Sequence, residues 1–260
     1  MVHLASLNDE QAQSVQQLDA SYVAGLFDGY AARFEQELIQ DLNYQGHLLV
    51  TNALKAQLDL NKAPCQQSVT TIVDLGCGTG LLGELLRKLF HGIGSWCTLP
   101  DRSCSPANVR ILGVDLSQRM VDISRGRMAT IDDDSVIVYD QVELSDGVAY
   151  LQTLASHSVA AVTASDVFIY IGSLEDTFRE CARVLLEGGL LVFTVELPDP
   201  ESESDVKLLK SGRFGHSKAH VEKVAKSFGF RVDFWENAVL RTQGGNPVAG
   251  AVVVLRNGAG

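Results

Sequence analysis

The chain has 260 residues, of which 46% are hydrophobic and 20% are charged, a composition typical of a globular protein with a sizeable core. Its 32 acidic residues outnumber its 21 basic residues, and the formal net charge of −11 disfavours nucleic acid and anionic membrane surfaces as partners. The five cysteines have no C-x-x-C spacing and no run approaches the roughly 20 apolar residues of a membrane span, so we expect a cytoplasmic protein without a disulfide framework or zinc site.

The N-terminal part of the chain has helical periodicity and much of the tyrosine. Asn8–Leu18 and Tyr30–Leu42 are predicted amphipathic helices. The aromatic residues in this region are Tyr22, Phe27, Tyr30, Phe34 and Tyr44. We expect residues 1–50 to form a helical cap or lid over a domain of residues 51–260.

From Val69 onward, short β-branched runs alternate with segments of helical period, the order that a parallel sheet with crossover helices requires. The predicted strands are Val69–Leu75, Val109–Asp115, Val136–Val142, Val159–Ser165, Leu190–Leu197, Phe230–Leu240 and Val248–Arg256. The predicted helices are Leu81–His91, Ser117–Ile131, Gly147–Ala155, Leu174–Leu186 and Lys218–Phe228. We therefore expect an α/β fold, a Rossmann-like, seven-stranded, mostly parallel sheet with helices on both faces.

The last two predicted strands are joined by a short turn, Thr242–Pro247, which contains Gly244 and Gly245. A crossover between parallel strands needs about a dozen residues or more. This pair is therefore predicted to form an antiparallel hairpin at the C-terminal end of the sheet.

The strongest motif follows the first predicted strand, where Asp74-Leu75-Gly76-Cys77-Gly78-Thr79-Gly80 leads directly into a helix. Glycine permits a positive φ and lets a ligand approach the backbone. Amides at a helix start suit either a pyrophosphate or the polar tail of a nucleoside. Dinucleotide sites use G-x-G-x-x-G, whereas this run is G-x-G-x-G with an aspartate two positions before the first glycine.

This motif resembles the first motif of class I S-adenosylmethionine-dependent methyltransferases. The resemblance implies that S-adenosylmethionine (SAM) is the cofactor and S-adenosylhomocysteine (SAH) its product. The residues of the motif that it places at the cofactor are Asp74, Gly76, Cys77, Gly78 and Gly80. It implies that the loop amides lie against the methionine moiety, and that Asp74 supports the loop and the amino group of the donor.

Further matches to the same family follow in the correct order. The second predicted strand ends in Asp115, where a carboxylate can accept both ribose hydroxyls, and Leu116 and Met120 follow it at the cofactor. After the third strand, Asp146 and Gly147 resemble the segment whose acid accepts from the adenine amino group. Asp140 is a competing choice for that acid, and we prefer Asp146.

The segment Ala164–Ile171 resembles the family's fourth motif, which lies beneath the transferred methyl group. We expect Asp166 and Tyr170 to orient the acceptor, because ligands bind at the carboxyl ends of the strands in such sheets, and we expect Asp166 also to contact the cofactor. Alternatively, Asp166 merely ends its strand. Ala182–Phe193 is similar to the family's helix–L-x-P-G-G–strand junction, with Glu187 in place of the usual proline.

Four segments narrow the resemblance to the methyltransferase domain often fused to tetratricopeptide repeats, although this chain has no such repeats. They are Leu26–Phe34, Asp166–Gly172, Ser211–Ser217 and Val239–Gly250. The insertion Phe90–Asn108 is longer than that group usually has.

The predicted activity is methyl transfer to O, N or S of a small-molecule acceptor. The predicted acceptor site consists of Tyr22, Phe27, Tyr30, Phe34, Tyr170, Arg213 and His216. The aromatic residues either wall the acceptor or pack on the sheet, and Arg213 favours an acceptor that bears a carboxylate.

His216 is the predicted catalytic base for an acceptor that must lose a proton. The alternatives are that it caps the helix near Ser217 or binds an acceptor carboxylate with Arg213. His216 and His220 lack a third ligand nearby, so no metal is expected. Cys77 is expected to be a small filler of the loop and not a nucleophile.

Two rival functions stay open from the sequence. One is a nicotinamide-dependent oxidoreductase, against which the glycine spacing argues, and the other is a SAM-binding protein without turnover. A protein acceptor is a further possibility because a fold does not choose its substrate. We expect a monomer or a homodimer.

Overall fold

The structure is a computed structural model that describes residues 17–60, 70–93, 109–199 and 204–258. The strands of its central sheet are β1 (Thr70–Leu75), β2 (Val109–Asp115), β5 (Gln141–Leu144), β6 (Val159–Ala164), β7 (Leu185–Glu196), β8 (Val206–Leu208), β9 (Phe214–His216), β10 (Phe230–Gln243) and β11 (Asn246–Asn257). The helices are α2 (Ala20–Tyr30), α3 (Gly46–Leu60), α4 (Leu81–Ile93), α5 (Gln118–Arg125), α6 (Gly147–Thr153), α7 (Glu175–Val184) and α8 (Lys218–Ser227).

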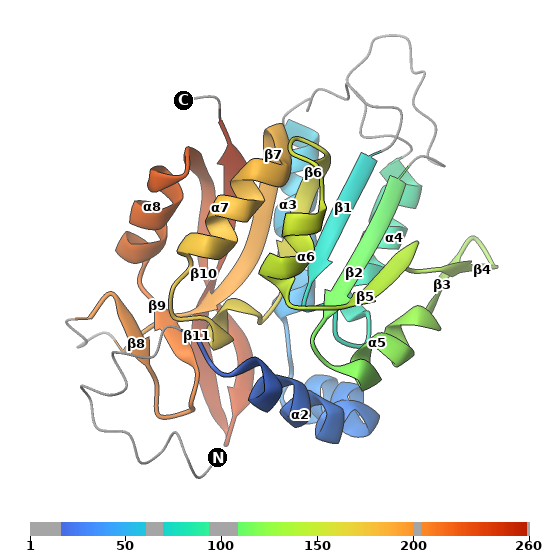
Figure 1. Ribbon diagram of the computed structural model, residues 1–260. Coiled ribbons are helices and arrows are strands. Elements are labelled where there is room, and N and C mark those ends of the chain that lie inside the picture. Colours follow the sequence, from blue (N-terminus) through green and yellow to red (C-terminus); the bar gives the residue numbers. More distant parts are fainter. Residues whose placement is uncertain (1–16, 61–69, 94–108, 200–203, 259–260) are drawn as a thin grey trace.

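The sheet has the order β10-β11-β7-β6-β1-β2-β5, with β8 and β9 attached beside β7 (Figure 1). The pairs β1–β2, β1–β6, β2–β5 and β6–β7 are parallel. Strand β11 lies between β7 and β10 and is antiparallel to both. The predicted α/β fold, with its mostly parallel sheet and C-terminal antiparallel hairpin, is confirmed.

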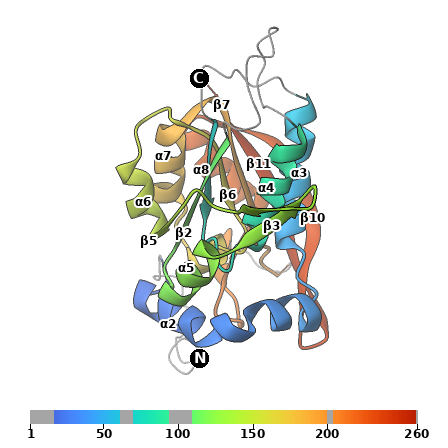
Figure 2. The same ribbon diagram turned by 90° about the vertical axis from the view of Figure 1, so that its right-hand side faces the viewer.

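Helices cover both faces of the sheet (Figure 2). Side chains alternate along each strand, so Ile72 of β1 packs with α3 and α4, whereas Val73 packs with α6, α7 and α8. Both side chains are fully buried. The rigid sheet places the carboxyl ends of β1, β2 and β6 at one edge.

A small hairpin replaces part of a predicted helix and part of a predicted strand. Helix α5 ends at Arg125, not at Ile131, and is followed by β3 (Met128–Ile131) and β4 (Asp134–Ile137), which pair with each other outside the main sheet. Asp132 and Asp133 both have positive φ, 49° and 70°, as a two-residue hairpin turn requires. The predicted strand Val136–Val142 is therefore divided between this hairpin and β5.

The N-terminal cap also differs from the prediction in its boundaries. Helix α2 begins after Asp19, whose side chain accepts a hydrogen bond from the Tyr22 amide at 3.0 Å. The predicted helix Tyr30–Leu42 is helical over almost its whole length, but it is a 3₁₀-helix at Ala31–Arg33 and a π-helix at Gln36–Asp41, with α-helical residues between them. Helix α3 and the short strands β8 and β9 were not predicted.

Some predictions fall on residues outside the described part of the chain. They are the helix Asn8–Leu18 up to residue 16 and the insertion Phe90–Asn108 from residue 94. Among the described residues, no helix combines the length and apolar character needed to cross a bilayer.

Candidate functional site

The glycine loop joins β1 to α4 with a backbone that only glycine adopts readily. Gly76 and Gly78 have φ of 61° and 54°, and the Cys77 amide donates to the Val114 carbonyl oxygen at 3.0 Å. A Cβ on Gly76 would lie 2.5 Å from a methyl carbon of Val167. A Cβ on Gly78 would instead point into the space in front of Phe34, 3.8 Å from its ring. The loop at Gly78 is therefore open toward the cap.

Asp115 ends β2 beside this loop. One of its carboxylate oxygens accepts from the Gly78 amide at 2.9 Å, and the other accepts from the Ser117 amide at 2.8 Å. Burial raises the pKa of Asp115, and the amide hydrogen bonds oppose that effect. Asp115 therefore fixes the glycine loop and the start of α5 to one carboxylate.

Asp146 lies two residues after the end of β5 and faces the same space. Its Oδ1 accepts from the Val148 and Ala149 amides at 2.9 and 3.0 Å and so caps α6. Asp140 is differently placed, because its Oδ2 binds the Ile111 amide at 2.7 Å and the Arg87 guanidinium at 2.6 Å. Of these two acids, Asp146 alone lines the cavity described below.

Asp74 faces the interior of the protein. It is 1% exposed and accepts from the Tyr139 hydroxyl at 2.6 Å and the Thr163 hydroxyl at 3.0 Å. Burial raises the pKa of this carboxyl to about 7. It joins β1 to Thr163 of β6 and to Tyr139, and it does not line the cavity, so its position does not fit the predicted contact with the amino group of the donor.

The buried carboxyl of Asp74 predicts a pH dependence of stability. Between pH 3.8 and about 7, the unfolded chain releases a proton that the folded protein retains, so the free energy of unfolding falls as pH rises. Asp74→Asn removes this titration and still offers Tyr139 an acceptor. We expect the stability of wild type relative to Asp74→Asn to fall by on the order of 3 kcal/mol over this range. Urea unfolding of both proteins at several pH values measures this difference. If the free energy of unfolding has the same pH dependence in wild type and in Asp74→Asn, the prediction is wrong.

A cavity of about 550 Å³ lies between the cap and the carboxyl ends of the strands, within the roughly 300–1,000 Å³ of small-molecule sites. The predicted site residues that line it are Phe27, Tyr30, Phe34, Gly76, Gly78, Asp115, Leu116, Asp146, Gly147, Asp166, Tyr170 and Arg213. The predicted site residues that do not line it are Tyr22, Asp74, Cys77, Gly80, Met120 and His216.

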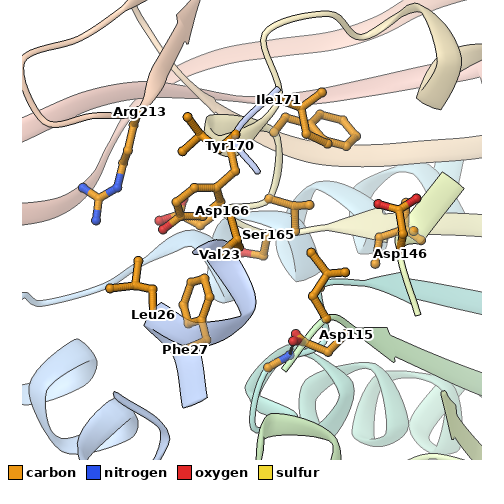
Figure 3. Close-up of a pocket in the computed structure, with 18 of the residues that line it drawn as sticks. Val23, Leu26, Phe27, Asp115, Asp146, Ser165, Asp166, Tyr170, Ile171 and Arg213 are labelled. Carbon is orange, nitrogen blue, oxygen red and sulfur yellow. Dashed lines mark hydrogen bonds between the residues drawn. The ribbon is translucent and has the colours of Figure 1, made fainter. Parts of the chain in front are cut away.

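Phe27 of the cap lies against Tyr170 at the cavity (Figure 3). The rings of Phe27 and Tyr170 are nearly perpendicular, with centroids 5.7 Å apart, and Phe34 packs in the same edge-on manner against Phe27 and Tyr30. Burial raises the pKa of Tyr170. The phenol therefore stays neutral near pH 7 and can donate a hydrogen bond.

Charged residues that the sequence did not single out lie behind Asp166. Arg241 of β10 is 2% exposed and forms ion pairs with Asp166 and with Glu196 of β7. Glu196 is also 3.8 Å from Arg213. Burial raises the pKa of Glu196, and the two arginines oppose that effect. This network holds Asp166 at the cavity in a strained backbone conformation with φ of 57°.

His216 does not reach the cavity. Its side chain is fully buried on β9, with Nε2 3.1 Å from the Phe168 carbonyl oxygen, and burial lowers its pKa to about 4. A ring in this position has no path to an acceptor in the cavity, so the geometry does not support the predicted roles of His216 as base or acceptor contact.

Of the other predicted residues outside the cavity, Cys77, Met120 and Gly80 lie in or near the loop, whereas Tyr22 does not. Cys77 is buried with Sγ 3.9 Å from the Ser124 hydroxyl, and burial raises its pKa well above the usual value, which disfavours a thiolate. Met120 is fully buried, and Tyr22 is exposed on α2. A Cβ on Gly80 would meet Arg127 at 2.7 Å. In the described ranges, no cluster of three or more His, Cys, Asp or Glu residues could hold a metal ion.

Part of the chain is similar to a known protein family. Residues 73–191 match the family model of a methyltransferase domain. The methyltransferase-domain match spans the glycine loop, Asp115, Asp146 and Asp166. No curated protein matches the chain.

Solved methyltransferases share the fold. Magnesium protoporphyrin IX methyltransferase from Synechocystis PCC 6803 with bound SAH is 17% identical over 91% of this chain and 98% of its own, with a TM-score of 0.59. Geranyl diphosphate C-methyltransferase from Streptomyces coelicolor A3(2) is 17% identical over 79% and 80%, with a TM-score of 0.54. A SAM-dependent methyltransferase from Methanosarcina mazei is 15% identical over 74% and 94%, with a TM-score of 0.54.

Together, the methyltransferase-domain match and these folds support the resemblance to class I SAM-dependent methyltransferases. The solved structures show the shared fold alone at these identities. The narrower resemblance to domains fused to tetratricopeptide repeats stays a prediction.

Proposed function

We propose that this protein transfers a methyl group from SAM to an O, N or S atom of a small-molecule acceptor. The observation that carries the proposal is the position of Asp115, whose carboxylate is tied to the Gly78 amide at 2.9 Å and lines the cavity. Acids at the carboxyl end of the second strand bind ribose hydroxyls in folds of this type.

The residues present at the cavity fit the donor. Gly78 leaves the space before Phe34 free of a side chain, Asp115 supplies acceptors for the sugar hydroxyls, and Asp146 has one oxygen, Oδ2, that is not used in capping α6. When bound there, SAM supplies a methyl group on a positively charged sulfur. The aromatic rings of Phe27, Phe34 and Tyr170 can contact a cation favourably.

The protein's own contribution to the reaction is alignment and exclusion of water. The cap covers the strand ends, and Tyr170 can donate a hydrogen bond from its neutral phenol to the acceptor. No histidine is among the described residues that line the cavity. We therefore propose that methyl transfer relies on positioning by Asp166 and Tyr170 and not on His216.

We propose that the acceptor bears a carboxylate, because Arg213 lines the cavity and is held there by the Gln243 side chain at 2.9 Å. Arg213→Ala is expected to raise the KM for the acceptor with little change in the affinity for SAH. Arg241 is a poorer anion site, since Asp166 and Glu196 already neutralise it.

The test of the proposed function is methyl transfer itself. The protein is incubated with isotopically labelled SAM and a metabolite extract, and products are sought that gain the mass of one CH₂ group. A labelled small molecule supports the proposal. Label on protein alone would overturn the small-molecule acceptor, and SAH binding without any labelled product would favour a binding protein without turnover.

The two acids near the proposed adenine site can be distinguished by substitution. Asp146→Asn keeps the helix cap, because asparagine caps as well as aspartate, but it puts an NH₂ group where a carboxylate oxygen could accept from adenine. We expect the Kd for SAH to rise about tenfold in Asp146→Asn and to stay unchanged in Asp140→Asn. Calorimetric titration with SAH measures the Kd of both variants. A raised Kd in Asp140→Asn with an unchanged Kd in Asp146→Asn would assign the adenine contact to Asp140.

A further inference from the structure

The cap helix α2 ends against the start of α5, and Asp28 takes part in each hydrogen bond described between them. Asp28 Oδ1 accepts from the Ser117 hydroxyl at 2.5 Å and from the Arg119 amide at 3.1 Å. The Asp28 carbonyl oxygen accepts from the Arg119 guanidinium, also at 3.1 Å. Figure 1 and Figure 2 both show α2 beside α5.

Ser117 connects this contact to the proposed donor site. Its side chain is fully buried, its amide donates to Asp115 Oδ1 at 2.8 Å, and its hydroxyl oxygen accepts from the Met120 amide at 3.2 Å. The hydroxyl has one proton, and with it Ser117 donates a hydrogen bond to Asp28. A continuous row of hydrogen bonds runs from Asp28 through Ser117 and Asp115 to the Gly78 amide.

Asp28 also completes the N-terminus of α5. The first amides of a helix have no partner within the helix, and a negative charge there is favourable. Ser117 satisfies the Met120 amide, whereas the Arg119 amide depends on Asp28 from another element. If the cap moved away, the Arg119 amide and the Ser117 hydroxyl proton would both lose their acceptor, whereas the Ser117 hydroxyl oxygen would keep its bond from the Met120 amide.

A second contact joins the cap to the other side of the glycine loop. Glu35 forms an ion pair with Arg127, whose guanidinium also donates to the Thr79 carbonyl oxygen at 3.1 Å and binds Glu84 at 2.8 Å. The cap is thus attached on both sides of the residues that would hold the donor.

We infer that Asp28 is a positioning residue that couples closure of the cap to the orientation of Asp115, and hence to donor binding. The inference rests on the proposed function, since it assigns to Asp28 a role at the same site. Asp28 touches Ser117 and Arg119, and it acts on the donor through Asp115.

The experiment compares three variants of the full chain. Asp28→Ala removes both accepted hydrogen bonds, whereas Asp28→Asn keeps an oxygen that can accept both. Glu37→Gln removes the same charge from the cap, but Glu37 pairs with Arg33 within the cap and has no contact with α5 among the interactions described. The Kd for SAH is measured by calorimetry, and hydrogen exchange of α2 and α5 is measured with and without SAH.

We expect Asp28→Ala to raise the Kd about tenfold and to speed exchange in α2 and at the start of α5. Asp28→Asn should stay within about threefold of wild type and Glu37→Gln within about twofold. If Asp28→Ala does not fold, Ser117→Ala is measured in its place. It removes the hydroxyl that links Asp28 to Ser117 in the same row of hydrogen bonds and should also raise the Kd for SAH.

A purely structural role would lower the melting temperature of Asp28→Ala and leave its Kd for SAH within about twofold of wild type, and that result overturns the inference. Wild-type protein that gives no heat with SAH overturns the proposed function instead. In that case hydrogen exchange is the measurement that tests the inference. An Asp28→Ala variant with unchanged hydrogen exchange in α2 and α5 then overturns the coupling of the cap to Asp115.

Discussion

Replacing Asp115 with alanine is expected to raise the Kd for SAH by on the order of 100-fold. The substitution removes the acceptor for two sugar hydroxyls, and each hydrogen bond to a charged group contributes about 1.5–3 kcal/mol. It also leaves the Gly78 and Ser117 amides without the carboxylate that now joins them at 2.9 and 2.8 Å. Calorimetric titration with SAH measures the effect.

Two further variants separate binding from folding in this experiment. Asp122→Ala removes the same charge from the exposed side of α5 and should leave the Kd for SAH unchanged. Asp115→Asn retains one oxygen, enough for one of the two amides that Asp115 joins, and should lose less stability than Asp115→Ala while still binding SAH weakly. An Asp115→Ala protein that binds SAH within about threefold of wild type would show that this carboxylate does not hold the donor.

Replacing Arg241 with methionine is expected to lower the free energy of unfolding by about 3–5 kcal/mol, because it leaves buried acids without their counter-ion. The Arg241 side chain is 2% exposed, and those of Glu196 and Asp166 are 3% and 17% exposed. Methionine fills much of the same volume, so the loss reflects charge and not a cavity. Urea unfolding at neutral pH measures the difference.

The partner acid supplies the control for this prediction. Adding Glu196→Gln to Arg241→Met removes the more buried of the two acids that Arg241 neutralises and should restore part of the lost stability. Arg213→Met should cost less than Arg241→Met, since Arg213 is more exposed and lies farther from Glu196, at 3.8 Å. A loss below about 1 kcal/mol in Arg241→Met would mean that the ion pairs contribute no more than surface pairs do.

The sheet could be predicted from the sequence because its central strands are buried on both faces and form continuous apolar runs. Ile72 and Val73 illustrate this, since both are fully buried although they face opposite layers. The positions of Gly78, Asp115 and Asp146 at the cavity followed in the same way, because each lies at or just beyond the end of a strand that the fold fixes.

The sequence could not show contacts between elements far apart in the chain. Arg241 and Asp166 are separated by 75 positions, and a charged residue within an apolar strand, as in Val239-Leu240-Arg241, was the one signal of a buried pair. His216 was overvalued because a histidine near a predicted cavity cannot be distinguished by type from one buried against the Phe168 carbonyl. The turn at Asp132 and Asp133 needed positive φ at two non-glycine residues, which periodicity does not reveal.

The central claim is that the cavity at the ends of β1 and β2 binds a sulfonium nucleoside with Asp115 at its sugar. The most direct measurement is calorimetric titration of ligand-stripped wild-type protein, once with SAH and once with NAD. The account predicts saturable heat with SAH and none with NAD. Heat with NAD and none with SAH would contradict it and would favour a nicotinamide-dependent oxidoreductase.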